Sequence, residues 1–159
     1  MDNNPFWNYT LHVYEIETVR NILLRWQDDY GCDVNVLLCC CWLASRQQQL
    51  TEAQLLELQR VCELWRSQCL LPLRNIRRYV KQQPAADSIY QQLKSAEISA
   101  EQWQQDLMFQ CQQSFSWGDV ENSQGPGALN LRRYFGLLNT AKWGEVVADA
   151  EELLSLLKL

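Results

Sequence analysis

The hydrophobic positions of this chain recur with a helical period, and one segment is apolar on every side. This segment, DVNVLLCCCWLA over residues 33–44, begins at Asp33, whose carboxylate can accept hydrogen bonds from the free amides of a first helical turn. A helix without a polar face must be surrounded by other helices. We therefore predict that it is the central helix of an all-α domain, with Cys39, Cys40 and Leu43 fully buried.

The other segments carry apolar residues on one face, which predicts helices that pack around the central one. We expect these helices over about residues 5–14, 15–30, 51–82 with a bend or restart at Pro72, 87–111, 129–138 and 143–157. A connector is expected near 82–87 and a loop over 115–128, and the pattern contains no strand or internal repeat. The sequence thus predicts a single compact all-α domain over residues 1–159, with six or seven helices.

Composition places the chain in a broad class. With 47% hydrophobic and 21% charged residues, it has the composition of a globular protein and not of a disordered one. The longest apolar run, residues 36–44, is far shorter than the ~20 residues that a membrane helix needs. The N-terminal MDNNPFW has neither the basic nor the apolar region of a signal peptide. We therefore expect a soluble cytoplasmic protein without membrane contact.

The cysteine pattern favours free thiols. The chain has seven cysteines, an odd number, and three of them are consecutive, at positions 39–41. Consecutive helical residues project about 100° apart, so these three cannot converge on one metal ion. Free cysteine commonly behaves as a small buried hydrophobe. We therefore expect neither a disulfide scaffold nor a metal or other cofactor.

Charge is distributed unevenly. Residues 1–83 carry nine basic and nine acidic side chains, and residues 84–159 carry five basic and ten acidic ones, so the second half holds the whole net charge of −5. Within the first half, Arg74, Arg77, Arg78 and Lys81 lie at i, i+3, i+4 and i+7, which places them in one cationic stripe on a helix.

Two interpretations of the stripe are open. In the first, the stripe has no function in binding and is either solvated or paired with the acidic second half of the chain. In the second, it is an anion site, because clustered arginines match the geometry of carboxylates and phosphates. Candidate internal partners are Glu145, Asp149, Glu151 and Glu152. A nucleic acid is a poor candidate for the partner, because the sequence pI is about 4.9 and no nucleic-acid-binding motif is present. An acidic or phosphorylated partner fits better.

Other candidate residues are weaker. His12 is the only histidine, so any histidine-dependent catalysis would have to use it. Asp28 and Asp29 could hold a divalent metal in an enzyme, but a single acidic pair is a weak signal. The 18 glutamines, many of them in the long helix over 87–111, are interpreted as neutral solvated residues.

Three parts of the sequence resemble a known family. They are NPFW at residues 4–7, YGCDVNVLL at residues 30–38 with Cys41 and Trp42, and PLRNIRR at residues 72–78. These motifs are similar to a family of short gammaproteobacterial proteins of unknown function, and the similarity covers most of residues 1–81. The resemblance implies a bacterial, cytoplasmic, all-α protein, and it assigns no catalytic residue.

Three functions of different classes follow. The preferred one is a non-enzymatic helical interaction module that binds an acidic or phosphorylated partner through the stripe. The second is a binder of a phosphorylated or apolar-tailed small ligand, held by Arg74, Arg77 and Arg78 beside apolar side chains. The third, least favoured, is a metal-dependent enzyme that uses Asp28 and Asp29. A deep pocket under the arginines would favour the small ligand, and a flat exposed stripe would favour a protein partner.

Overall fold

The computed structural model describes residues 4–120 and 124–159, and within these residues it contains helices and no strands. The elements are α1 (Pro5–Tyr14), α2 (Glu17–Tyr30), α3 (Val34–Ser45), α4 (Glu52–Trp65), a π-helical turn η1 (Arg66–Leu70), α5 (Leu71–Lys81), α6 (Asp87–Gln112), α7 (Gly125–Leu138) and α8 (Trp143–Leu157). The chain runs through α4, η1 and α5 without interruption. Counting this run as one helix gives seven in the described residues, and the predicted all-α fold is confirmed.

The central position of α3 is also confirmed. Every residue from Val34 to Ala44 is buried, and Cys39, Cys40 and Leu43 are 0% exposed. Helices α1, α2, α6 and α7 pack against α3. Asp33 caps the start of α3, because its carboxylate accepts a hydrogen bond from the backbone N–H of Asn35, as expected for an N-cap. The body of the protein is therefore built around one apolar helix.

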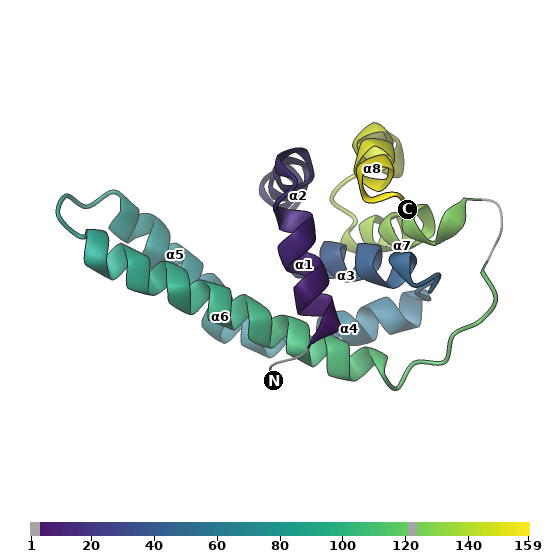
Figure 1. The fold of residues 1–159 in the computed structure, drawn as a ribbon, viewed down its shortest axis with the longest axis horizontal. Coiled ribbons are helices and arrows are strands. Elements are labelled where there is room, and N and C mark those ends of the chain that lie inside the picture. Colours follow the sequence, from purple (N-terminus) through teal and green to yellow (C-terminus); the bar gives the residue numbers. More distant parts are fainter. Residues whose placement is uncertain (1–3, 121–123) are drawn as a thin grey trace.

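A helical hairpin extends from this body. Helix α5 and the first half of α6 run antiparallel and side by side, and Figure 1 shows them projecting away from the other helices. We call this pair of segments, residues 71–81 and 87–101, the arm. Its outer faces carry exposed apolar side chains, among them Ile76, Tyr79 and Ile89.

Pro72 does not interrupt the helix at the base of the arm. A proline ring in a helix clashes with the carbonyl of the residue four positions earlier, which here is Gln68, and proline lacks the N–H of the helical ladder. Gln68 lies within η1, the π-helical turn that immediately precedes Pro72. The wider i→i+5 turn accommodates the proline, so the chain stays helical from α4 into α5.

Helix α7 starts earlier than the sequence suggested. The loop was expected to reach residue 128, but α7 already begins at Gly125, with Pro126 in its first turn. Proline is favourable there because a first-turn N–H has no partner within the helix. A Cβ atom on Gly127 would lie 2.6 Å from Cδ2 of Leu154, so a residue without a side chain allows α7 and α8 to approach closely.

All seven cysteines are free thiols in the structure, and five of them are buried. Burial raises the pKa of Cys32, Cys41 and Cys62 to about 12, because desolvation disfavours the thiolate. These side chains behave as core hydrophobes. No helix within residues 4–120 and 124–159 combines the length and the apolarity needed to cross a membrane.

Candidate functional site

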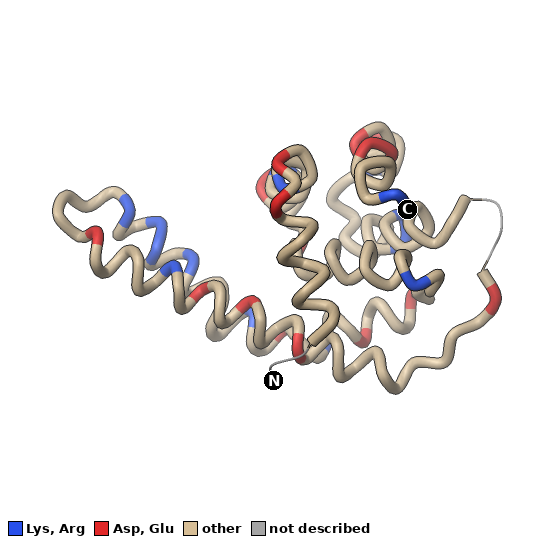
Figure 2. Tube along the Cα trace, viewed as in Figure 1, with Lys and Arg blue, Asp and Glu red and all other residues tan. Residues whose placement is uncertain are grey.

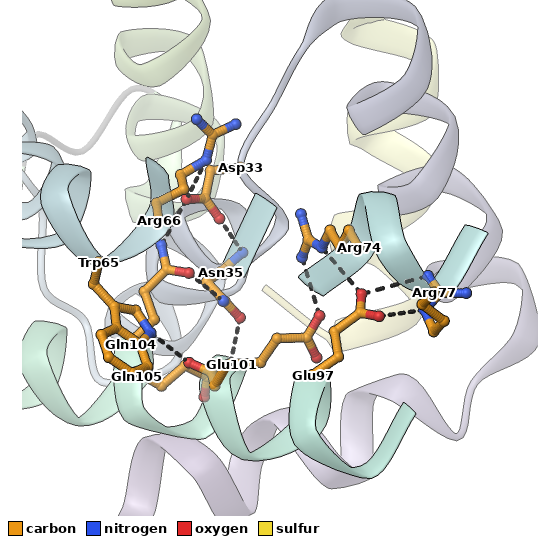
Figure 3. A network of polar contacts seen from close by, with 11 residues as sticks. Asp33, Asn35, Trp65, Arg66, Arg74, Arg77, Glu97, Glu101, Gln104 and Gln105 are labelled. Atoms are coloured by element: carbon orange, nitrogen blue, oxygen red, sulfur yellow. Dashed lines mark hydrogen bonds and ion pairs between the residues drawn. The ribbon is translucent and has the colours of Figure 1, made fainter. Parts of the chain in front are cut away.

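The cationic stripe lies along the arm, and half of it is paired with carboxylates of α6. Arg74 is buried, and its guanidinium contacts Glu97 at 3.1 Å and Glu101 at 3.0 Å. Arg77 donates hydrogen bonds to both carboxylate oxygens of Glu97 (Figure 3). Two of the four stripe residues, Arg74 and Arg77, are therefore paired with carboxylates in the second half of the chain.

The partners differ from the carboxylates that the sequence suggested. Glu97 and Glu101 face the stripe because α5 folds back against α6, a pairing that a five-residue connector enforces. Asp149 of α8, one of the suggested partners, instead pairs with Arg25 of α2 at 2.6 Å. Figure 2 shows the basic residues of α5 next to the acidic residues of α6 along the arm.

The two carboxylates differ in their environment. Glu97 accepts hydrogen bonds from both arginines, and its hydrogen bond raises the pKa of Arg77. Desolvation raises the pKa of Glu101, and the nearby Arg74 only partly opposes this effect. Glu101 therefore takes up a proton more readily on acidification than an ordinary glutamate does.

This difference predicts a pH effect on stability. Because the pKa of Glu101 is raised on folding, the folded chain keeps a proton on Glu101 at pH values where the unfolded chain has lost it, from about 4.3 upward. In that range this residue makes the free energy of unfolding fall as pH rises. The variant Glu101→Gln cannot titrate, so its stability relative to the wild type should increase with pH in urea unfolding experiments. Parallel pH profiles for the two proteins would contradict this assignment.

The remaining cations of the arm have no internal partner. Arg78 and Lys81 of α5 and Lys94 of α6 are exposed, and none forms an ion pair with another described residue. Arg78 and Lys94 border a cleft of about 560 Å³ between the arm and the body, whereas Lys81 does not line it. The structure therefore brings three of the four stripe residues, Arg74, Arg77 and Arg78, to one concave site.

Five helices form this cleft. Its lining comes from α1, α2, α3, α5 and α6, and comprises Trp7, Thr10, Leu11, Tyr14, Arg20, Leu24, Gln27, Val34, Asn35, Leu38, Arg74, Arg77, Arg78, Lys94, Glu97, Ile98, Glu101 and Gln105. Three of the apolar members are unusually accessible: Leu11 is 49% exposed, Leu24 is 38% exposed and Ile98 is 46% exposed. Exposed apolar side chains that border a concave surface are characteristic of a ligand site.

The cleft is positively charged although the protein is acidic. Its lining contains four arginines and one lysine against two glutamates, and these glutamates are already engaged by Arg74 and Arg77. The positive charge that remains comes from Arg20, Arg78 and Lys94. An anion placed there gains from all three side chains, and a partly enclosed site screens this attraction less than open solvent does.

Neutral polar side chains form the end of the cleft that lies within the body. Thr10 donates a hydrogen bond to Gln105 at 2.9 Å, and Gln105 donates to Asn35 at 2.8 Å. Asn35 donates to Gln104 at 2.9 Å, and Gln104 donates to Asp33 at 2.7 Å (Figure 3). We call these five residues the amide chain.

Arg66 and Tyr134 complete the far end of the amide chain. The carboxylate of Asp33 lies 3.3 Å from Nε of Arg66, and the backbone N–H of Asp33 donates to the hydroxyl of Tyr134 at 2.8 Å. Both Gln104 and Gln105 are 0% exposed. The interpretation of the glutamines in this helix as solvated is therefore wrong for these two residues.

The other candidate residues lie away from the cleft. Asp28 and Asp29 are exposed in the last turn of α2, and His12 is exposed on α1, where Nδ1 lies 3.0 Å from the carbonyl oxygen of Asn8. Within the described parts of the chain, no group of three or more His, Cys, Asp or Glu side chains is placed to hold a metal ion.

Comparison with protein families gives a match over residues 5–108, to a family described as protein of unknown function, DUF2390. The chain belongs to this family. The match to DUF2390 extends from α1 nearly to the end of α6, so it includes every residue that lines the cleft. Comparison with curated proteins and with solved structures gave no match.

The DUF2390 segment contains structural features of the cleft that the sequence pattern only partly indicated. The arginines were visible as a stripe, but the amide chain was not predicted. A signal for it exists: Asn35 is the one uncharged polar side chain between Val34 and Ala44, in an otherwise apolar helix. A buried amide must find hydrogen-bond partners, so its presence in that helix implies polar side chains on a neighbouring helix.

Proposed function

We propose that this protein binds an anionic small molecule with an apolar part in the cleft between the arm and the body. The observation that carries the proposal is the combination, in one concavity, of unpaired cations with accessible apolar side chains. From the sequence, a pocket under the arginines was expected to indicate a small ligand, and a flat exposed stripe was expected to indicate a protein partner. A concave site beside Arg74, Arg77 and Arg78 favours the small ligand over a protein partner.

Each part of the ligand has a corresponding part of the cleft. Arg78 and Lys94 suit a phosphate or carboxylate, because both are cationic donors that have no ion-pair partner within residues 4–120 and 124–159. Leu11, Leu24 and Ile98 suit an apolar body, and burial of their exposed surface contributes roughly 25 cal/mol per Å². The ion pairs of Arg74 and Arg77 hold the arm wall in place and contribute positioning more than free charge.

The test uses dodecyl phosphate and inorganic phosphate as probes in isothermal titration calorimetry, below the micellar concentration. Dodecyl phosphate should bind, and inorganic phosphate should bind much more weakly because it leaves the apolar wall uncovered. The double variant Arg78→Gln with Lys94→Gln should weaken dodecyl phosphate binding about tenfold or more, since two charge-assisted contacts are lost. Added salt should also weaken binding in the wild type.

Lys81→Gln is the matched control. Lys81 belongs to the same stripe and the same helix, it is exposed, and it does not line the cleft. This variant should bind dodecyl phosphate as the wild type does. Absence of binding, or an equal loss in Lys81→Gln and in the double variant, would contradict the proposal.

An acidic or phosphorylated protein segment is the second candidate, and the exposed position of Lys81 favours it. Arg78 and Lys81 lie three residues apart on the arm and are accessible from outside the cleft. A phosphoserine peptide added to the same titrations distinguishes the two functions. Two results together would support the protein partner. The peptide would bind, with Lys81→Gln and Arg78→Gln weakening its binding equally, and dodecyl phosphate would not bind.

A further inference from the structure

The cleft has different chemistry at its two ends, and this difference restricts the ligand further. The α6 residues that line it are Lys94, Glu97, Ile98, Glu101 and Gln105. Lys94 and Gln105 are eleven residues apart on one straight helix, which separates them by ~16 Å along its axis. The cleft is therefore an elongated groove that runs along α6 from the cationic arm to the amide chain.

Part of the amide chain lies in the wall at the body end of the groove, where Thr10 is 7% exposed and Asn35 is 4% exposed. Of the amide chain, Thr10, Asn35 and Gln105 line the cleft. A primary amide carries two N–H donors, and the internal hydrogen bonds use one donor each of Asn35 and Gln105. The Thr10 hydroxyl donates to Gln105, so its oxygen still has acceptor capacity.

The direction of this chain is fixed at its far end. Each member donates toward Asp33, and the carboxylate of Asp33 is an acceptor that cannot reverse this order while it is ionised. The amides of Asn35 and Gln105 are therefore held as donors, with their second N–H groups unused. A neutral oxygen atom is the group that best accepts these N–H donors.

The wall between the two ends is mainly aliphatic. Leu11, Leu24, Val34, Leu38 and Ile98 belong to the lining, together with Trp7 and Tyr14. Aliphatic side chains along a groove fit an aliphatic chain, whose surface they bury.

We infer that the ligand is an elongated amphiphile with an anionic group at Arg78 and Lys94, an aliphatic middle, and a neutral hydroxyl or carbonyl oxygen at Thr10, Asn35 and Gln105. This inference rests on the proposed function and specifies the ligand class of the same cleft. An acyl or alkyl chain of about twelve carbons with a terminal acid group and an oxygen at the other end has the length of the groove. Its far-end oxygen replaces hydrogen bonds to water with hydrogen bonds to the amide chain.

Dodecanoate and 12-hydroxydodecanoate form a matched pair of probes for calorimetric titration of the protein. They share the acid group and the chain and differ in one terminal hydroxyl. We expect 12-hydroxydodecanoate to bind roughly 3- to 10-fold more tightly, which corresponds to a single net hydrogen bond. An apolar end to the groove would give the opposite order, because a hydroxyl buried without a partner weakens binding.

Two further measurements assign the effect to the amide chain. In Thr10→Val, which keeps the shape of the side chain, the ratio of the two affinities should fall, because the hydroxyl of the probe loses the acceptor oxygen of Thr10. Thr18→Val is the control, because Thr18 is exposed on α2 and does not line the cleft. In the wild type, the side-chain amide resonances of Asn35 and Gln105 should shift with 12-hydroxydodecanoate and much less with dodecanoate. This second measurement needs no variant and holds if Thr10→Val does not fold.

The outcomes separate the inference from the proposed function. Equal affinity for both probes, with dodecanoate binding still weakened by Lys94→Gln, would overturn the inference and leave the proposed function in place. If dodecanoate, 12-hydroxydodecanoate and dodecyl phosphate all failed to bind, both would be overturned. The hydroxylated probe could also bind more tightly to the wild type and to Thr10→Val alike, without resonance shifts at Asn35 and Gln105. The oxygen would then lie elsewhere, and the inference would be overturned.

Discussion

Replacing Leu37 with alanine is expected to lower the free energy of unfolding by about 2–5 kcal/mol, the range for leucine-to-alanine changes in well-packed cores. Leu37 is 0% exposed in α3, the helix that is buried on every side. A cavity at this position has no solvent-facing side toward which the structure could relax, so we expect a value in the upper half of that range. Chemical denaturation with circular dichroism measures the effect.

Leu64→Ala is the matched control for the core variant. Leu64 lies in α4 and is 74% exposed, so the same change of side chain removes little buried surface. Its effect should stay within about 0.5 kcal/mol, as for most surface substitutions. Equal effects of the two substitutions would mean that α3 is not the centre of the folded protein.

Replacing Glu97 with glutamine is expected to destabilise the protein by ~3 kcal/mol. Glu97 holds both Arg74 and Arg77, and the Arg74 side chain is only 9% exposed. Removing one member of a buried ion pair leaves a desolvated charge without compensation, which typically costs about 3–5 kcal/mol. Because Arg74 keeps its contact with Glu101, the lower end of this range is expected. Thermal and urea unfolding both report the loss.

The surface pair Glu57 and Arg60 supplies a control with the same chemistry. Their side chains are 42% and 70% exposed, one turn apart on α4. Glu57→Gln should therefore leave the unfolding curve essentially unchanged, because water and salt already screen this pair. If Glu97→Gln proved as mild as Glu57→Gln, the arm would not depend on its internal ion pairs, and the charges of Arg74 and Arg77 would be available to a ligand.

The sequence by itself determined the features that depend on neighbouring residues. The run after Asp33 has no polar face, so its burial on all sides followed from the pattern alone, and the structure confirms it. The start of α4 is local in the same way, because the side chains of Thr51 and Gln54 form a capping box within one helical turn. The spacing of Arg74, Arg77 and Arg78 on one face was equally a local property of α5.

Only the tertiary structure decided what these faces meet. Glu97, rather than a carboxylate of α8, pairs with the stripe because α5 folds back on α6. The sequence contains several acidic segments, and its pattern does not indicate which of them lies against α5. The amide chain joins Thr10, Asn35 and Gln105 from three helices, over separations of 95 and 70 residues. A buried amide demands partners but does not specify which helix supplies them. The cleft arises in the same way, because a concave surface between an arm and a body exists only once the distant helices have packed.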